Sequence, residues 1–469
     1  MSTFKQFTLR FVFIGTAVIM ATGCQSAVAD TLIDTSRLQQ DGLTRPWFTQ
    51  VQMDVRRDRV ETVTFDGEFL TVQTKRGIIQ TIDGETGATV WVKNVGSPNL
   101  FTSSAGVGPN HTAVVNGSHL FIFDRKTGKH IWNRQLAGGV IGGPGVSKDN
   151  VFVPKVDGVL EVYSLDEPKP WKEVRSLANT QFPIWKYNSH GKTMVPPTVF
   201  NGMIGWANDR ADFYVARLRP MEILFRIETF DNIVVPPVRI NSFLYIVSID
   251  GYLYKVHTST GNIHWRFSTG SPLIHRPIAV DGFIYLSTPD GGLYRVLADE
   301  EVAEKYGLLD AQQNKKSKPA QQQPLKEGKE VWFNPHISQV LSVTRDRIFG
   351  LDNKGNIQIV DTQSGKSLGS VSTEGISLPI TNHLTDRIYL ATSDGLIQCL
   401  HDPKRVSPEK HNQAAHGKSN SQFEKDKREP NNPGNAEQEG HSLDDSLDDS
   451  QNAPDDSDDR TDEENNPFE

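Results

Sequence analysis

A short pattern recurs along the chain and restricts its fold more than any other feature. A Thr-Gly pair is followed, after three further residues, by a tryptophan in three segments: GETGATVW (84–91), RKTGKHIW (125–132) and TSTGNIHW (258–265). From Trp91 onward, aromatic residues recur at 132, 171, 225, 265 and 332, so intervals near 40 residues alternate with two longer ones. A period of this length indicates repeated supersecondary units.

Each repeat also contains two β-rich runs around a glycine turn, such as FLYIVSIDGYLYKV (243–256). This arrangement is typical of β-hairpins. Short prolyl segments such as PPTV and PPVR precede several hairpins, and proline is tolerated at the first residue of a strand. We therefore expect four strands in each unit. Eight hairpins begin near Phe69, Ala113, Val151, Met203, Phe243, Phe283, Arg347 and Arg387.

Eight four-stranded units predict an all-β fold, an eight-bladed β-propeller of antiparallel blades over residues 45–403. The eighth hairpin ends at Leu400 with no tryptophan strand after it, whereas Trp47 has no hairpin before it. We therefore expect the N-terminal strand around Trp47 to complete the last blade and close the ring. The long interval before Trp332 predicts an inserted loop at 299–328 that projects from one face of the ring.

These repeats resemble those of the quinoprotein (PQQ-like) propellers, whose tryptophans pack between neighbouring blades. The resemblance implies structural blade-docking roles for Trp47, Trp91, Trp132, Trp171, Trp265 and Trp332. Enzymes of that family use pyrroloquinoline quinone and calcium beside a Cys-Cys pair. This chain has two cysteines, Cys24 and Cys399, which are not adjacent. The resemblance is therefore to the non-enzymatic, BamB-like branch of exported lipoproteins, and we expect no catalytic residue, cofactor or metal.

The first 23 residues have the features of a signal peptide: Lys5, Arg10 and a short apolar run at 11–21. The segment ATGC (21–24) resembles a bacterial lipobox, which predicts lipidation of Cys24 and a linker over 24–44. The segment AVA (27–29) also fits a signal-peptidase site. Both alternatives export the protein. The lipobox favours a periplasm-facing lipoprotein of the outer membrane.

The acidic balance of the chain belongs to its C-terminal segment. Residues 404–469 contain 18 Asp and Glu against 8 Lys and Arg, and the whole chain has a net charge of −8, so the remainder is close to neutral. Nothing in this distribution calls for nucleic acid. A block of like charges with few aromatic residues predicts a disordered tail over 404–469.

Other candidates for chemistry are weak. The histidines lack the spacing of a metal site, and Cys399 lies in the apolar run LIQCL, which predicts a buried core residue. The glycine-rich stretch GGVIGGPG (138–145) falls at a crossing between two blades. We therefore expect a non-catalytic scaffold, a monomer within a complex, that binds an unidentified envelope protein. The alternatives are a quinoprotein dehydrogenase and a ligand- or carbohydrate-binding propeller.

Overall fold

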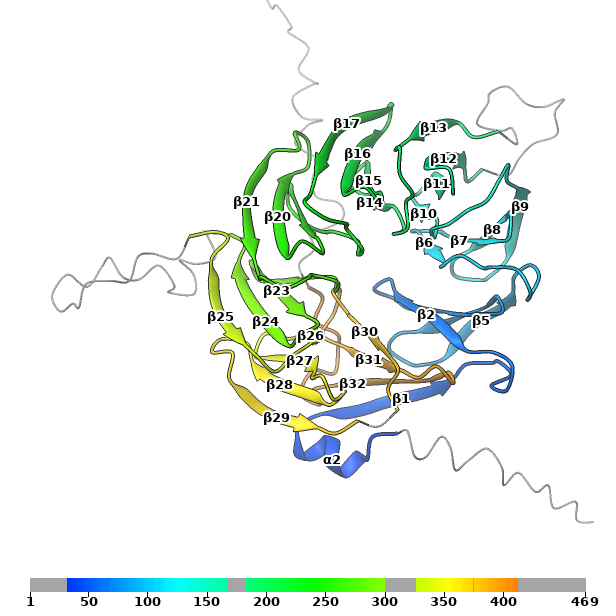
Figure 1. Cartoon of the computed structure of the whole chain (residues 1–469). Coiled ribbons are helices and arrows are strands. Elements are labelled where there is room, and N and C mark those ends of the chain that lie inside the picture. The colour runs from blue at the N-terminus through cyan, green and yellow to red at the C-terminus, as the bar shows by residue number, and fades with distance from the viewer. Residues whose placement is uncertain (1–31, 167–181, 300–325, 374, 412–469) are drawn as a thin grey trace, which may run out of the picture. The chain divides into compact units, whose positions relative to one another are not determined.

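A computed structural model describes residues 32–166, 182–299, 326–373 and 375–411 of the chain. These residues form eight four-stranded antiparallel sheets arranged as blades around a central opening (Figure 1). The chain runs from the innermost to the outermost strand of one blade before it crosses to the next. The predicted eight-bladed propeller is therefore confirmed.

The first four blades follow one another along the chain. Blade one contains β2 (Val60–Phe65), β3 (Phe69–Thr74), β4 (Ile78–Asp83) and β5 (Thr89–Asn94). Blade two contains β6 (Gly106–Val107), β7 (His111–Asn116), β8 (His119–Asp124) and β9 (His130–Gln135). Blade three contains β10 (Gly145–Val146), β11 (Asn150–Pro154), β12 (Val159–Ser164) and β13 (Trp185–Asn188). Blade four contains β14 (Thr198–Phe200), β15 (Met203–Ala207), β16 (Asp212–Leu218) and β17 (Met221–Glu228).

The remaining blades complete the ring. Blade five contains β18 (Val238–Ile240), β19 (Phe243–Val247), β20 (Tyr252–His257) and β21 (Ile263–Ser268). Blade six contains β22 (Ile278–Val280), β23 (Phe283–Thr288), β24 (Gly292–Leu297) and β25 (Glu330–Asn334). Blade seven contains β26 (Gln339–Val343), β27 (Arg347–Leu351), β28 (Ile357–Asp361) and β29 (Ser367–Val371). Blade eight contains β30 (Leu378–Ile380), β31 (Ile388–Ala391), β32 (Leu396–His401) and the N-terminal β1 (Thr44–Gln50).

The N-terminal strand closes the ring, as the unpaired eighth hairpin predicted. Strand β1 pairs antiparallel with β32, and Trp47 lies opposite Cys399 in that pairing. Cys399 is buried, which confirms its expected place in the core. Because β1 is the outer strand of a blade whose other strands come from the far end of the chain, the two ends hold the ring together.

The middle strands of each blade are buried on both faces because a neighbouring blade packs against each face. All six residues of β3 are buried, and so are all six of β23 and β32. This explains why these strands read as nearly continuous apolar runs, whereas the outer strands alternate between half-buried and exposed residues. The core is therefore a series of apolar layers between blades.

Glycines allow the inner strands of blades two to four to approach closely. A Cβ atom added at Gly106 would lie 2.0 Å from the carbonyl oxygen of Pro144, and one at Gly145 would lie 2.5 Å from that of Pro197. Side chains are therefore excluded from these positions. The glycine-rich stretch thus serves the packing of adjacent blades.

Two predicted boundaries were wrong. We expected a linker over 24–44, but helix α2 (Thr35–Gln40) begins in its second half, capped by Asp34. Leu38 and Leu43 are buried in a core cluster shared with blades seven and eight. We also expected the tail to begin at 404, yet residues 404–411 remain ordered against the ring. Both segments lie outside the repeats, so the period of the sequence does not predict them. Each is ordered by its contacts with the ring.

The outer strand of blade three also differs from its prediction. We expected this strand at Trp171, which lies outside the described residues, but the strand that pairs with β12 is β13. Trp185 lies opposite the fourth residue of β12, the register that Trp91 and Trp132 have in their own blades. Trp185 therefore takes the position assigned to Trp171. It also lies 40 residues before Phe225, which restores the period.

Candidate functional site

The five predicted tryptophans within the described residues lie between adjacent blades. The Trp47 Nε1 atom donates a hydrogen bond to the Gly84 carbonyl oxygen at 3.1 Å. The indole ring also covers Gly87, where an added Cβ would meet ring atoms at 2.5 Å. Gly87 has a φ of +71°, a conformation that side chains rarely adopt. The tryptophan of blade eight thus packs on the Thr-Gly turn of blade one.

The same contact recurs around the ring. Trp91 donates to the Arg125 carbonyl oxygen at 2.9 Å, and Trp132 donates to that of Leu165 at 3.1 Å. Trp332 donates to Thr362 at 3.1 Å. Trp265 instead donates to a carboxylate oxygen of Glu327 at 3.2 Å. All these contacts are structural, so a functional site has to be sought elsewhere on the ring.

The links between blades emerge on one face of the ring, and the other face carries different turns. In an antiparallel blade, the segment that leads to the next blade emerges on the same side as the turn between the second and third strands. We call this side the linker face; it includes the links 189–197, 229–237 and 269–277. The opposite side, the turn face, carries the remaining turns, α2 and residues 402–411.

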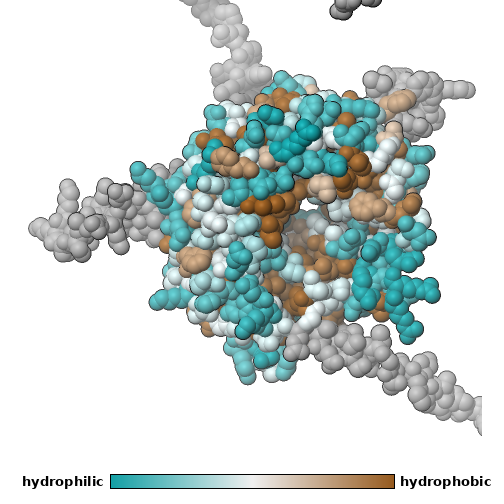
Figure 2. Space-filling model, in the orientation of Figure 1, coloured by the Kyte–Doolittle hydropathy of each residue, from teal (hydrophilic) through white to brown (hydrophobic). Residues whose placement is uncertain are grey.

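Most of the exposed large apolar side chains lie on the linker face. Among the described residues, eight of the fourteen exposed large hydrophobic residues belong to it: Val55, Leu100, Phe101, Val156, Met194, Phe230, Val234 and Ile274. Phe230 is 71% exposed. Figure 2 shows one face of the molecule, on which hydrophobic residues gather around the central opening and hydrophilic residues dominate the periphery.

Three of these residues form a repeat of their own. Met194, Val234 and Ile274 follow one another at intervals of 40 residues in three successive links. Each stands after a buried residue and three positions before a buried proline. Met194 and Val234 also line a cavity of about 280 Å³ between blades four and five. The links therefore present aliphatic side chains at equivalent positions of three adjacent blades.

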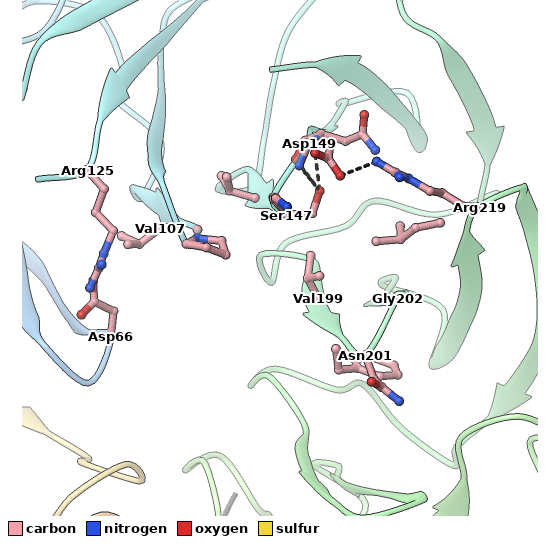
Figure 3. A pocket seen from close by; sticks show the side chains of 16 residues that line it. Asp66, Val107, Arg125, Ser147, Asp149, Val199, Asn201, Gly202 and Arg219 are labelled. Carbon is pink, nitrogen blue, oxygen red and sulfur yellow. Dashed lines mark hydrogen bonds and ion pairs between the residues drawn. The ribbon is translucent and has the colours of Figure 1, made fainter. Parts of the chain in front are cut away.

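A larger pocket of about 830 Å³ opens on the turn face of blades two to four. Its apolar walls include Val107 and Val199, which come from inner strands of two different blades. Figure 3 shows Arg219 and Asp149 pointing toward one another across one wall, at 2.5 Å. Arg125 and Asp66, which also line the pocket, form a second ion pair at 2.8 Å.

The described residues do not fit the cofactor chemistry of the enzymes that the repeats resemble. Within the described ranges, no three His, Cys, Asp or Glu side chains converge on a position that could hold a metal ion. Burial raises the pKa of the Cys399 thiol, so it is not a reactive thiolate. No helix within the described ranges is long and apolar enough to cross a membrane. We therefore derive no quinone or calcium chemistry from these residues.

Comparison with known proteins agrees with this geometry. A family model described as "Outer membrane protein assembly factor BamB" matches residues 75–182 and 183–304. The chain is a PQQ-like repeat propeller. The matched residues begin just before β4 of blade one and extend past the end of β24 in blade six. No curated protein matches the sequence.

Three solved structures share the fold of this PQQ-like repeat propeller. BamB from Moraxella catarrhalis has 15% sequence identity and a TM-score of 0.55, and the match covers 76% of this chain and 97% of that one. The computationally designed Ika8 protein has 11% identity, a TM-score of 0.53 and coverages of 75% and 98%. The C-terminal WD40 domain of Sif2 has 11% identity, a TM-score of 0.53 and coverages of 77% and 98%. At these identities the likeness shows the fold alone.

Proposed function

We propose that this protein is a non-catalytic protein-interaction scaffold of the bacterial cell envelope, and that it binds its partner through the linker face. The observation that carries the proposal is the set of exposed aliphatic side chains at Met194, Val234 and Ile274. Eight of the fourteen exposed large hydrophobic residues of the described chain gather on this face. Larger exposed apolar surfaces mark sites of protein binding.

The linker face has the rigidity that a binding surface requires. Buried Ile233 and Leu273 fix the backbone directly beside exposed Val234 and Ile274, and a buried proline follows three residues later in each link. Little conformational entropy is therefore lost when a partner covers these side chains, so their burial contributes to affinity. The adjacent cavity of about 280 Å³ offers a seat for an apolar side chain of the partner.

The family description supports an envelope partner. The matching model is described as an outer membrane protein assembly factor. The signal peptide and the lipobox cysteine Cys24 would place this propeller in the periplasm on a lipid anchor, beside such machinery. We therefore propose a BamB-like role in the assembly of outer-membrane proteins, with a protein partner and no nucleic acid.

Affinity capture from solubilised envelope membranes tests this proposal. Asp in place of Met194 or Val234 should abolish recovery of a stoichiometric partner, because a charge would be buried at the interface. L368D is the matched control, since Leu368 on β29 and Met194 are both 57% exposed. Equal recovery of the partner by M194D and L368D would exclude the linker face as the binding surface.

A separate assay tests the non-catalytic assignment. Reduction of a dye after reconstitution with quinone and calcium would overturn that assignment.

The anchor has a separate test. Mass spectrometry of the mature protein should find a lipidated Cys24 as its first residue. A mature chain that starts at an unmodified Asp30 would refute the anchor and leave the interaction proposal standing.

A further inference from the structure

The linker face carries a group of basic side chains over blade one. They come from two segments, the link 51–59 that precedes β2 and the turn 75–77 between β3 and β4. These segments contain two acidic residues, Asp54 and Asp58, against five basic ones. We call the five the basic cluster: Arg56, Arg57, Arg59, Lys75 and Arg76. All five residues are exposed.

Buried Asp58 holds the two segments of the basic cluster together. Its Oδ1 atom accepts hydrogen bonds from the backbone amide of Arg59 at 2.9 Å and from that of Arg76 at 3.1 Å. The amide of Lys75 also donates to the carbonyl oxygen of Arg59 at 2.9 Å. The backbone beneath the cluster is therefore fixed, and the like charges stay close together in the free protein.

The charge of the basic cluster is only partly offset. Arg57 pairs with Asp54 at 3.8 Å, and Arg59 pairs with Asp394 at 3.2 Å. All four side chains of these pairs are more than half exposed, so water weakens both pairs. The other three members of the cluster form no ion pair with a carboxylate of the described residues. The cluster therefore presents a net positive charge to the solvent.

Blade one carries a basic residue at a turn position that is acidic in other blades. In the corresponding turns of blades three, five, six and eight, an aspartate precedes the glycine: Asp157, Asp250, Asp290 and Asp394. Aspartate suits this position because it accepts a backbone hydrogen bond, as Asp250 does from Tyr252 at 2.8 Å. Blade one has Arg76 there, and the amide of Ile78 donates instead to the Thr74 hydroxyl at 3.1 Å. The turn therefore does not need the Arg76 side chain, which is available to a ligand.

Exposed apolar side chains border the basic cluster. The next link, 95–105, contains no charged residue, and its Leu100 and Phe101 are exposed. This link lies against the turn 75–77, because the amide of Val95 donates to the carbonyl oxygen of Gly77 at 2.9 Å. The linker face over blade one therefore combines positive charge with an adjacent apolar pair.

We propose that the basic cluster, together with Leu100 and Phe101, binds the surface of a membrane that contains anionic phospholipids. Lysine and arginine are attracted to the negative charge of such a surface. Leucine and phenylalanine beside them become buried at the boundary between headgroups and acyl chains. An acidic protein segment would use the cations alone, so the apolar pair favours a membrane.

This membrane site goes beyond the proposed protein interaction, which rests on the links 189–197, 229–237 and 269–277. Blade one lies across the central opening from blade five (Figure 1). The two surfaces are therefore separate, and each is tested by its own variants.

Sedimentation with lipid vesicles tests the membrane site. The mature chain from Gln25, without a lipid, contains every described residue, so its binding reports the protein surface alone. It should sediment with vesicles of equal parts phosphatidylcholine and phosphatidylglycerol and not with phosphatidylcholine alone, and added salt should weaken the binding. The double variant K75Q and R76Q should weaken binding roughly tenfold or more. L100S should also weaken it, because this leucine leaves water on binding.

Matched controls use other exposed residues of the chain. The double variant K192Q and R210Q removes the same charge from another part of the linker face, and L368S removes an exposed leucine of β29. Both controls should bind vesicles like the unchanged chain, and circular dichroism checks that every variant is folded. Equal binding to the two kinds of vesicle, or equal loss in the two double variants, would overturn the membrane site. Binding to polyglutamate but not to vesicles would also overturn it and would assign the basic cluster to an acidic protein segment.

Discussion

At the scale of single residues, one indole side chain performs two tasks at four junctions between blades, those of Trp47, Trp91, Trp265 and Trp332. The Trp91 ring covers Gly128, where an added Cβ would approach ring atoms at 2.6 Å, while its Nε1 atom donates to Arg125. An aromatic side chain with one polar end suits this position, since its apolar body is buried and its N–H still finds an acceptor. Phe225 takes the same place over Gly261, which shows that the covering of the glycine can persist without the hydrogen bond.

Substitution of Trp91 separates these two contributions. W91F should reduce the free energy of unfolding by about 1 kcal/mol, which is typical for the loss of one hydrogen bond. W91A should reduce it by about 3–5 kcal/mol, because it also leaves a cavity between blades one and two. Urea denaturation followed by tryptophan fluorescence measures both values. V90A changes an adjacent exposed residue and should have little effect; a W91A variant as stable as V90A would contradict the docking role.

At the scale of elements, the segment 402–411 shows how the end of the propeller is fixed. Arg387 has a side chain that is 2% exposed, and it donates to the carboxylate of Glu85 in blade one and to the carbonyl oxygens of Arg405 and Val406. Further along, the amide of Glu409 donates to Asp386 at 2.9 Å. One buried guanidinium therefore joins blade eight, blade one and the C-terminal segment.

Removal of this guanidinium should loosen the C-terminal segment and weaken the ring together. R387M should lower the free energy of unfolding by roughly 3 kcal/mol, the low end for a broken buried pair, because Glu85 retains partial solvation. Limited proteolysis should also cleave after Lys404 or Arg405 sooner than in the unchanged protein. R345Q breaks an exposed pair with Glu409 and should cost below about 1 kcal/mol. Similar cleavage rates in R387M and R345Q would refute the role of Arg387.

The same segment predicts a dependence of stability on pH. His411 is buried and its Nε2 lies 2.8 Å from the Val343 carbonyl oxygen; burial lowers its pKa, while Asp386 and Asp281 act in the opposite direction. The pKa of neighbouring His383 is lowered as well. Below pH 6.5 the unfolded chain therefore binds more protons than the folded chain, and stability should fall as the pH falls.

Thermal melts between pH 8 and pH 5 measure this effect. The melting temperature should drop below about pH 6.5, the ordinary pKa of histidine. The combined H383Q and H411Q variant should show a smaller drop, whereas H190Q, which changes a residue of a turn on the linker face, should keep the full dependence. A double variant with the full dependence would contradict this assignment.

At the scale of the whole molecule, the sequence predicts the elements that belong to the repeats. It does not predict contacts between segments that only the closed ring brings together. The position of Trp47 in the last blade was predictable, because the eighth hairpin had no outer strand of its own. The docking of Leu38 was not, because α2 is a single short helix with no period. Contacts between different repeats leave no trace in the pattern of one repeat.

The closing strand is the feature on which the ring as a whole depends. A chain that begins at Val51 would lack β1, so that β32 would expose its unpaired edge and blade one would lose the cover of Trp47 over Gly87. Open strand edges promote association between chains. We expect this truncated chain to aggregate and to unfold at lower urea concentration than W47A, which retains the strand.

A second truncation distinguishes the strand from the helix before it. A chain that begins at Leu43 keeps β1 and loses α2 and the residues before it, including buried Leu38 and Ile33. This chain should remain monomeric in size-exclusion chromatography and should lose about 2–5 kcal/mol, the cost of one buried leucine. If the two truncated chains aggregated equally, α2 and not β1 would be the element that secures closure. Equal behaviour of the Val51 chain and the unchanged protein would show that seven complete blades suffice to hold the ring.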